Sequence, residues 1–235
     1  MSTKKYNVKA IWKTLQGEGL FAGRPAVFVR MVGCNMWSGY AHTRERDAER
    51  NGASCPLWCD TDFTKEGSQS YTADELANAV AQTGEEVRFC VVTGGEPLMQ
   101  LDAALVKALH QQGFFIAIET NGTQSVKESC WDPQTEKLEA PDWIVCSPKQ
   151  KQEKLQLEFF DELKLVVPDY LPENYNEFKK RQRSHIVQGQ ALPLLWLQPE
   201  DGPRLEEATG LAINSALSNP AWRVSVQTHK ILEVE

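Results

Sequence analysis

The chain has 235 residues, 41% of them hydrophobic and 24% charged, with a formal net charge of −7 at pH 7. A chain of this length and composition can bury one sizeable core, so we expect a single domain over residues 1–235. The acidic balance argues against general binding to nucleic acid or to anionic membranes, and it is compatible with an enzyme that acts on small molecules.

The N-terminal region is predicted to form two strands, at 8–15 and 26–32, separated by a glycine-rich turn. The turn contains Gln16-Gly17-Glu18-Gly19, whose glycines let the backbone approach a bound molecule closely, although an ordinary hairpin loop has the same composition. Arg30 lies within the second apolar run. Its guanidinium can serve a structural ion pair or hold a carboxylate.

The stretch 33–63 holds half of the six cysteines, at Cys34, Cys55 and Cys59. A polar insertion at about 35–54 separates the first two, and we expect it to be a solvated loop or a short exposed helix. Cysteines at both ends of a long polar excursion indicate one shared ligand, either a metal ion or an iron–sulfur cluster. A structural zinc takes four protein ligands, whereas a cluster held by three cysteines keeps one iron free for another molecule.

The spacing alone leaves zinc and cluster both open, because further zinc ligands occur elsewhere in the chain. These are His42, Cys90, Cys130 and Cys146. Disulfides are not expected, because the N-terminus has no apolar signal segment and no stretch is apolar enough to span a membrane. These features predict a cytoplasmic protein with reduced thiols.

Beyond these cysteines, short apolar runs alternate with helical patterns. We expect helices at 72–83, 101–112, 173–182 and 203–217, strands at 88–92, 114–118, 143–146, 162–167, 194–197 and 222–226, and an irregular crossover at 123–141. Thr72 is the expected N-cap of the first of these helices, with acidic residues in its first turn. Cys90 and Cys146 fall in buried strands, where cysteine acts as a small hydrophobic residue.

Continuous apolar strands separated by crossovers indicate an α/β protein with a parallel sheet. Polar or glycine-rich residues follow the strands, as in Thr93-Gly94-Gly95-Glu96 and Glu119-Thr120-Asn121. In barrel-like α/β folds the site is built at this end of the strands. Because too few helices are visible for eight β/α units, we predict an incomplete TIM-like barrel of this type, with its site at the C-terminal ends of the strands.

The chain resembles the radical S-adenosylmethionine (SAM) enzymes, and among them the 7-carboxy-7-deazaguanine synthase family of the queuosine and 7-deazapurine pathway. The resemblance runs nearly end to end. It rests on TLQGEG with GRPAVFVR, GCNMWSG, CDTDF, TGGEP, IETNG, SPK, ELKLVVP, LQPEDGP and WRVSVQTHK, and on the long insertion between the first two cysteines. One departure is that three residues separate Cys55 from Cys59, where the family pattern has two.

This resemblance implies that Cys34, Cys55 and Cys59 hold a [4Fe–4S] cluster whose open iron is chelated by SAM. One electron delivered to the bound SAM would give a 5′-deoxyadenosyl radical, chemistry that belongs to the cofactors. The SAM-binding residues that the family implies are Trp58, Asp60, Gly95, Ser147, Lys149, Gln198, Pro199, Glu200 and Asp201.

The implied substrate is 6-carboxy-5,6,7,8-tetrahydropterin, which undergoes radical ring contraction and loses ammonia to give 7-carboxy-7-deazaguanine. Arg30 and a Mg²⁺ ion would hold its carboxylate, and Thr61 would give its hydroxyl to the Mg²⁺. Gln16, Glu119 and Asn121 would meet the polar edge of the pterin. The full set of implied substrate-binding residues is Leu15, Gln16, Gly17, Arg30, Thr93, Glu119, Asn121 and Glu235.

Plainer interpretations stand beside these assignments. Glu119 can cap a strand end, Thr61 can be a turn residue, and His229 is expected to be structural. No protein acid or base is singled out for the rearrangement.

The family further implies a homodimeric lyase that takes electrons from a donor such as a flavodoxin or a ferredoxin. One alternative is another radical SAM enzyme, either for a different small substrate or for activating a glycyl-radical enzyme. A more distant alternative is a zinc-binding interaction module.

Overall fold

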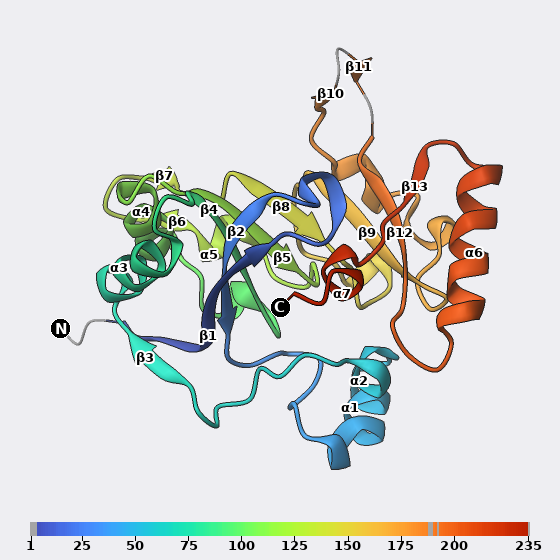
Figure 1. The fold of residues 1–235 in the computed structure, drawn as a ribbon, viewed down its shortest axis with the longest axis horizontal. Helices are drawn as coiled ribbons and strands as arrows, with labels where there is room; N and C mark the ends of the chain where they lie inside the picture. The colour runs from blue at the N-terminus through green and yellow to red at the C-terminus, as the bar shows by residue number, and fades with distance from the viewer. Residues whose placement is uncertain (1–3, 188–189, 192, 235) are drawn as a thin grey trace.

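A large mixed sheet is the framework of the computed structural model, which describes residues 4–187, 190–191 and 193–234 (Figure 1). The strand order is β13-β12-β9-β8-β5-β4-β2-β1-β3. Neighbours from β2 to β13 are parallel, whereas β1 pairs antiparallel with β2 and β3. The bounds are β1 Tyr6–Leu15, β2 Pro25–Met31, β3 Gln69–Tyr71, β4 Phe89–Gly94, β5 Phe115–Thr120, β8 Trp143–Cys146, β9 Glu162–Val167, β12 Leu195–Pro199 and β13 Trp222–Val224.

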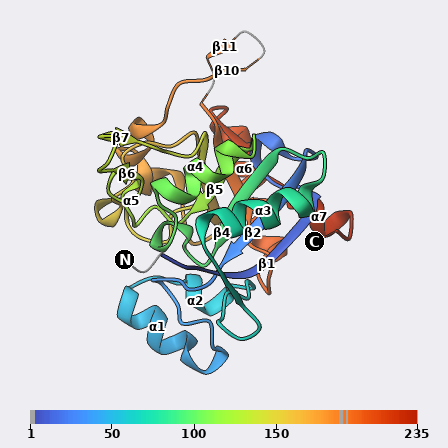
Figure 2. The ribbon, with the colours of Figure 1, turned by 90° about the vertical axis from the view of Figure 1, so that its left-hand side faces the viewer.

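Helices cover the sheet at both ends. The α-helices are α1 Arg44–Asn51, α2 Cys55–Trp58, α3 Ala73–Gly84, α4 Ala103–Gln111, α5 Val126–Ser129, α6 Leu205–Ser218 and α7 Thr228–Ile231. Helices α3 and α4 lie side by side over the β1–β5 end, and α6 packs on β9, β12 and β13 (Figures 1 and 2). Helices α1 and α2 stand below the sheet (Figure 2). Among the described residues, no helix is long and apolar enough to cross a membrane.

The continuous apolar character of the strands follows from burial on both faces. In β4, Cys90 and Val92 pack into the larger core cluster that also contains apolar residues of α3 and α4. Phe89 and Val91 face the other way and pack with Trp143 in a smaller cluster. Because both faces of the strand are covered, period-two alternation is absent from its sequence.

The strands and three of the helices expected from the sequence are confirmed to within a few residues. At the start of α3, the Thr72 hydroxyl accepts a hydrogen bond from the Glu75 backbone N–H at 3.3 Å, and the Glu75 carboxylate accepts one from the Thr72 N–H at 2.7 Å. This reciprocal capping box satisfies two N–H groups that the helix itself leaves unpaired, which explains why the helix begins there.

The α-helix predicted at 173–182 is wrong. The structure has two short 3₁₀ turns, Pro172–Tyr175 and Phe178–Arg181. Tyr175 and Phe178 are buried, and the Phe178 ring stacks on Phe160 with a centroid separation of 5.0 Å. The core contacts of these two aromatic side chains thus outweigh the helical preference of the polar sequence pattern and determine the local conformation.

Two other segments contain more structure than expected. The crossover at 123–141 contains α5 and a small antiparallel pair, β6 Trp131–Asp132 with β7 Lys137–Leu138. A second small pair, β10 Ile186–Val187 with β11 Gln190–Ala191, projects from the opposite side of the molecule to α1 (Figure 1).

The insertion at 35–54 contains the short helix α1, as one of the two expected forms. It is not simply solvated, because Met36 and Trp37 are buried and the Trp37 ring packs against Phe63. The Asp47 carboxylate is also buried and accepts hydrogen bonds from the Ser38 N–H at 3.0 Å and the Thr43 hydroxyl at 2.9 Å. The insertion is therefore anchored at its base, while its outer surface faces solvent.

Candidate active site

Cys34, Cys55 and Cys59 line one cavity of about 210 Å³ at the carboxyl ends of the strands. Cys34 follows β2, whereas Cys55 and Cys59 lie at the two ends of the one-turn helix α2. All three thiols are free. The fold therefore brings together three thiols that are up to 25 residues apart in the sequence.

The three-residue spacing between Cys55 and Cys59 corresponds to one helical turn. The Cys59 N–H donates to the Cys55 carbonyl at 3.0 Å, and residues four apart in a helix lie on the same face. Burial raises the pKa of Cys34 to about 11 and that of Cys55 to about 12. These thiols therefore remain protonated at neutral pH unless a bound cation replaces the proton.

The surroundings of the thiols fit an iron–sulfur cluster with an anionic ligand. A Cβ on Gly95 would lie 2.5 Å from the Cys34 Cβ and 2.3 Å from the Gly33 carbonyl oxygen, so only glycine permits this approach of the TGGEP loop. Lys149 also lines the cavity, and its ammonium donates only to Ser147, at 2.7 Å to the hydroxyl and 3.2 Å to the carbonyl. Within the described part of the chain, the hydrogen bonds of the Lys149 ammonium go to Ser147 and not to a carboxylate, so its charge is available to a bound anionic group.

A closed zinc site is not formed by these side chains. Across residues 4–187, 190–191 and 193–234, no three His, Cys, Asp or Glu side chains are arranged around one metal ion. Cys90, Cys130 and Cys146 are buried and do not line the cavity. Thiolates that each hold a different iron of a cluster do not need to converge on a single point, so the arrangement is compatible with a cluster.

Most of the residues assigned to SAM line the same cavity. These are Trp58, Asp60, Gly95, Ser147, Lys149 and Gln198. Pro199 ends β12 and is not among the lining residues, nor are the two acidic residues that follow it. The Glu200 carboxylate is buried and bonded to Arg204, and Asp201 pairs with Lys230 at 2.5 Å.

A larger cavity of about 650 Å³ adjoins the first. Its lining includes Leu15, Gln16, Gly17, Arg30, Thr61, Thr93 and Glu119. Thr61, Thr93 and Glu119 line both cavities, so a molecule in one lies beside a molecule in the other. Asn121 lines the smaller cavity, and Glu235 lies outside the described residues.

The polar side chains that line the larger cavity form hydrogen bonds with one another. Glu119 accepts hydrogen bonds from the Gln16 amide at 3.2 Å and from the Thr93 hydroxyl at 3.4 Å. The guanidinium of Arg30 lies 5.1 Å from the centroid of the Trp12 ring and lines the cavity without an ion pair to any described residue. A cation without an anionic partner, facing a cavity, is suited to bind a carboxylate.

The glycines of Gln16-Gly17-Glu18-Gly19 make room for other parts of the chain. A Cβ on Gly17 would lie 2.0 Å from His229 Nδ1. The Gly17 carbonyl also accepts the Thr228 N–H at 2.9 Å. The C-terminal helix α7 therefore packs directly on this turn, and His229 becomes part of the wall of the larger cavity.

A buried ion pair at the junction of the cavities was not predicted from the sequence. The Lys164 ammonium bonds to the Glu18 carboxylate, which also accepts from the Gln198 amide at 3.0 Å and the Gln227 amide at 2.9 Å. Burial by itself would raise the pKa of Glu18, but the charge of Lys164 and these hydrogen bonds outweigh it and lower the pKa to about 2. The sequence feature that could have indicated this ion pair is the lysine within the largely apolar run ELKLVV.

Comparison with known proteins connects this geometry to a family. No protein-family model matches the chain. A protein named 7-carboxy-7-deazaguanine synthase from Bradyrhizobium diazoefficiens is 43% identical over 238 residues, covering 97% of this chain and 99% of the relative. Proteins of the same name are 38% identical in Nitratidesulfovibrio vulgaris, covering 97% of this chain and 99% of the relative, and 30% identical in Escherichia coli K12, covering 98% and 99%.

A solved structure agrees with these relatives. The crystal structure of QueE from Escherichia coli superposes with a TM-score of 0.63 at 26% identity and covers 95% of this chain and 94% of that chain. Identity above 40% over nearly the full length, together with the motifs at the carboxyl ends of the strands, places the sequence within one group of enzymes. The chain belongs to the 7-carboxy-7-deazaguanine synthase family.

Proposed function

We propose that the chain converts 6-carboxy-5,6,7,8-tetrahydropterin to 7-carboxy-7-deazaguanine, with loss of ammonia, in a SAM- and Mg²⁺-dependent radical reaction. The observation that carries this proposal is the pair of adjoining cavities, one lined by three free thiols and the other by Arg30 and Glu119. A reaction between a cofactor and a substrate requires two neighbouring sites with a common boundary.

In this proposal Cys34, Cys55 and Cys59 would hold a [4Fe–4S] cluster, with SAM bound beside it in the same cavity. When bound, the cluster and SAM supply a radical that can remove a hydrogen atom from the substrate. Lys149 offers its unpaired charge to the carboxylate of SAM. The backbone of Gly95 would face the amino group, and Trp58, Asp60, Ser147 and Gln198, which line the same cavity, would supply further contacts. Pro199, Glu200 and Asp201 do not line the cavity, so their proposed role is to hold the loop that carries Gln198.

The larger cavity binds the substrate. The planar fork of Arg30 matches a carboxylate, and the coupled amide and carboxylate of Gln16 and Glu119 supply a donor and acceptors for the pterin edge. Thr61 lines both cavities, and its hydroxyl would be a ligand for Mg²⁺ at the boundary between them. Leu15, Gly17 and Thr93 complete this lining, and Asn121 would reach the substrate from the adjoining smaller cavity. Glu235, outside the described residues, belongs to the proposed site on the family resemblance alone.

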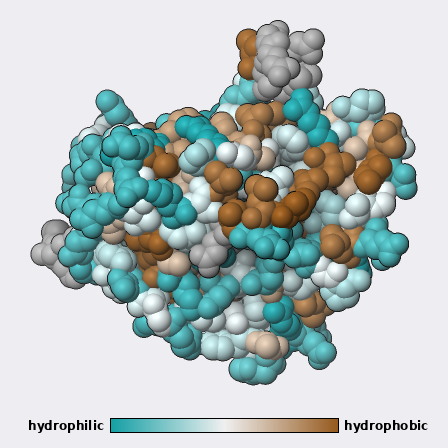
Figure 3. Space-filling model, in the orientation of Figure 1, coloured by the Kyte–Doolittle hydropathy of each residue, from teal (hydrophilic) through white to brown (hydrophobic). Residues whose placement is uncertain are grey.

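The proposal extends to architecture and partners. We propose that residues 1–235 form one catalytic domain with the insertion at 35–54, and that the parallel strands form an incomplete TIM-like barrel. A homodimer is supported by exposed apolar side chains on α6 and near the C-terminus (Figure 3). They are Leu205, Ile213, Leu217, Val226, Ile231, Leu232 and Val234. A flavodoxin or ferredoxin would supply the electron in the cytoplasm.

The test is anaerobic reconstitution with iron and sulfide, followed by incubation with SAM, dithionite, Mg²⁺ and the carboxytetrahydropterin. We expect mass spectrometry to show a product with the mass of 7-carboxy-7-deazaguanine. Cys34→Ala, Cys55→Ala and Cys59→Ala should each abolish it, whereas Cys90→Ala is the matched control because that thiol is buried away from both cavities. SAM cleavage without conversion of the pterin would overturn the substrate, and zinc without iron would overturn the radical chemistry as well.

A further inference from the structure

The turn between Cys55 and Cys59 is held from outside by one carboxylate. Asp169 Oδ2 accepts hydrogen bonds from the Ser54 hydroxyl at 2.5 Å and from the Trp58 indole N–H at 2.9 Å. Ser54 and Trp58 are four residues apart and bracket the helical turn α2, so a single acceptor spans its length. Asp169 itself follows β9, and the clamp therefore ties the cysteine-bearing turn to the sheet.

Asp169 is fixed in turn by Arg204. The guanidinium donates to Asp169 Oδ1 at 2.9 Å and to Oδ2 at 3.1 Å, a two-pronged contact. The same guanidinium donates to the buried Glu200 carboxylate from Nε at 2.9 Å. Burial opposes ionisation of Asp169, but the hydrogen bonds from Arg204, Ser54 and Trp58 outweigh it and lower its pKa. The carboxylate is thus charged and fully oriented at neutral pH.

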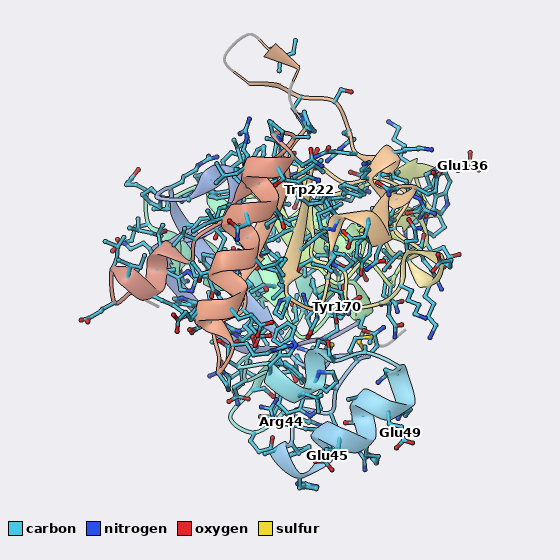
Figure 4. The ribbon with its side chains drawn as sticks, turned by 90° about the vertical axis from the view of Figure 1, so that its right-hand side faces the viewer. Arg44, Glu45, Glu49, Glu136, Tyr170 and Trp222 are labelled. Carbon is cyan, nitrogen blue, oxygen red and sulfur yellow. The ribbon has the colours of Figure 1, made fainter. Side chains whose placement is uncertain are left out.

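A second cation holds the other side of the turn. Arg44, at the start of α1, donates to the Pro56 carbonyl at 2.5 Å and to the Cys59 carbonyl at 2.9 Å. Its guanidinium lies 4.2 Å from the buried Trp37 ring. In Figure 4, Arg44 lies between α1 and α2, and Tyr170 lies between α2 and the body of the sheet, whereas Glu45 and Glu49 project from α1 outward. The turn is thus fixed on the insertion side and on the sheet side.

We propose that Asp169 and Arg204 act as positioning residues for the cluster, forming a clamp that adapts the three-residue spacing between Cys55 and Cys59 to a single cluster. The physical reason is the helical register. Removing one residue would rotate Trp58 by about 100° relative to Ser54, so that one carboxylate could no longer bind both. The spacing and the clamp therefore depend on each other. This inference rests on the proposed function, because it takes Cys55 and Cys59 as cluster ligands.

The test measures iron retention, which does not depend on turnover. Asp169→Ala, Arg204→Met and Trp58→Phe are reconstituted anaerobically, and the loss of visible absorbance is followed after addition of an iron chelator. Partners that orient metal ligands typically change metal affinity by about 10–100-fold, so we expect Asp169→Ala to release iron at least about 10-fold faster than the wild type. Trp58→Phe keeps an aromatic ring and removes only the N–H donor, so its effect should be smaller. Asp74→Ala, at an exposed position of α3, is the control.

A double variant separates positioning from general destabilisation. If the clamp acts as a unit, Trp58→Phe should have no further effect on iron release in the Asp169→Ala background, and cluster-free melting temperatures should not account for the difference. Iron release from both Asp169→Ala and Arg204→Met at the wild-type rate would overturn the clamp and leave the cluster assignment intact, as would additive effects in the double variant. A wild-type chain that takes up no iron would overturn both.

Discussion

Replacing Lys164 by Met should destabilise the protein strongly, because it leaves Glu18 as a buried carboxylate without its cation. The side chains of Lys164 and Glu18 are only 6% and 12% exposed. Breaking a buried ion pair from one side costs about 3–5 kcal/mol, since the remaining charge is uncompensated. For a chain of this size, each kcal/mol lowers the melting temperature by about 2–4 °C, so a drop of at least about 6 °C is expected.

The assay is thermal and urea unfolding of the cluster-free protein under reducing conditions. The double variant Lys164→Met with Glu18→Gln removes both charges and should recover much of the lost stability. A single variant within 1 kcal/mol of the wild type at pH 7, or a double variant no more stable than the single, would refute the reasoning.

The same pair predicts a pH dependence with a definite sign. The pKa of Glu18 falls from 4.5 in the unfolded chain to about 2 in the folded chain. Its contribution to stability is therefore complete above pH 4.5 and is lost as the pH falls toward 2. The pKa of Lys164 is raised above 10.5, because the attraction of Glu18 outweighs burial, so its contribution is complete below pH 10.5 and is lost at higher pH. The stability difference between wild type and Lys164→Met should thus shrink in acid.

Three further predictions concern separate contacts. Gly17→Ala would place a Cβ 2.0 Å from His229 Nδ1, so the KM for the pterin should rise, and His229→Ala in the same chain should reverse part of that rise. Asp47→Ala removes the buried acceptor at the base of the insertion and should speed proteolysis at 35–54; equal cleavage rates would count against this anchor. Thr72→Ala removes the α3 N-cap and should cost about 1 kcal/mol in urea unfolding.

The sequence was sufficient for local features whose cause is local. The strands are recognisable because their residues are apolar on both faces, as in β9, where all six residues are buried. The start of α3 is recognisable because a capping box is contained within four residues. The three cysteines around the polar insertion likewise indicated a shared ligand, because thiol side chains bind metal ions whatever the surrounding fold.

The local sequence pattern was misleading where contacts with residues distant in the sequence outweigh the local conformational preference. The segment 173–182 has a polar helical composition, yet the burial of Tyr175 and Phe178 makes it two 3₁₀ turns. The sequence of the insertion gave no sign of buried residues, yet the ring of Trp37 packs edge-on against the ring of Phe63, with a centroid separation of 5.5 Å. In both cases the free energy of burying an aromatic side chain exceeds the weak local preference.

The strands, three of the four predicted helices and the polar loops after the strands could be predicted from the sequence, whereas the role of the three cysteines as ligands stays a prediction from the family resemblance. Which side chains of these loops meet depends on the tertiary structure. The pairing of Lys164 with Glu18, separated by 146 residues, and the clamp from Asp169 to Ser54, separated by 115, have no sequence periodicity that could reveal them. The reason is physical: a buried charge needs a partner. Which residue supplies it depends on the order in which the strands are placed side by side.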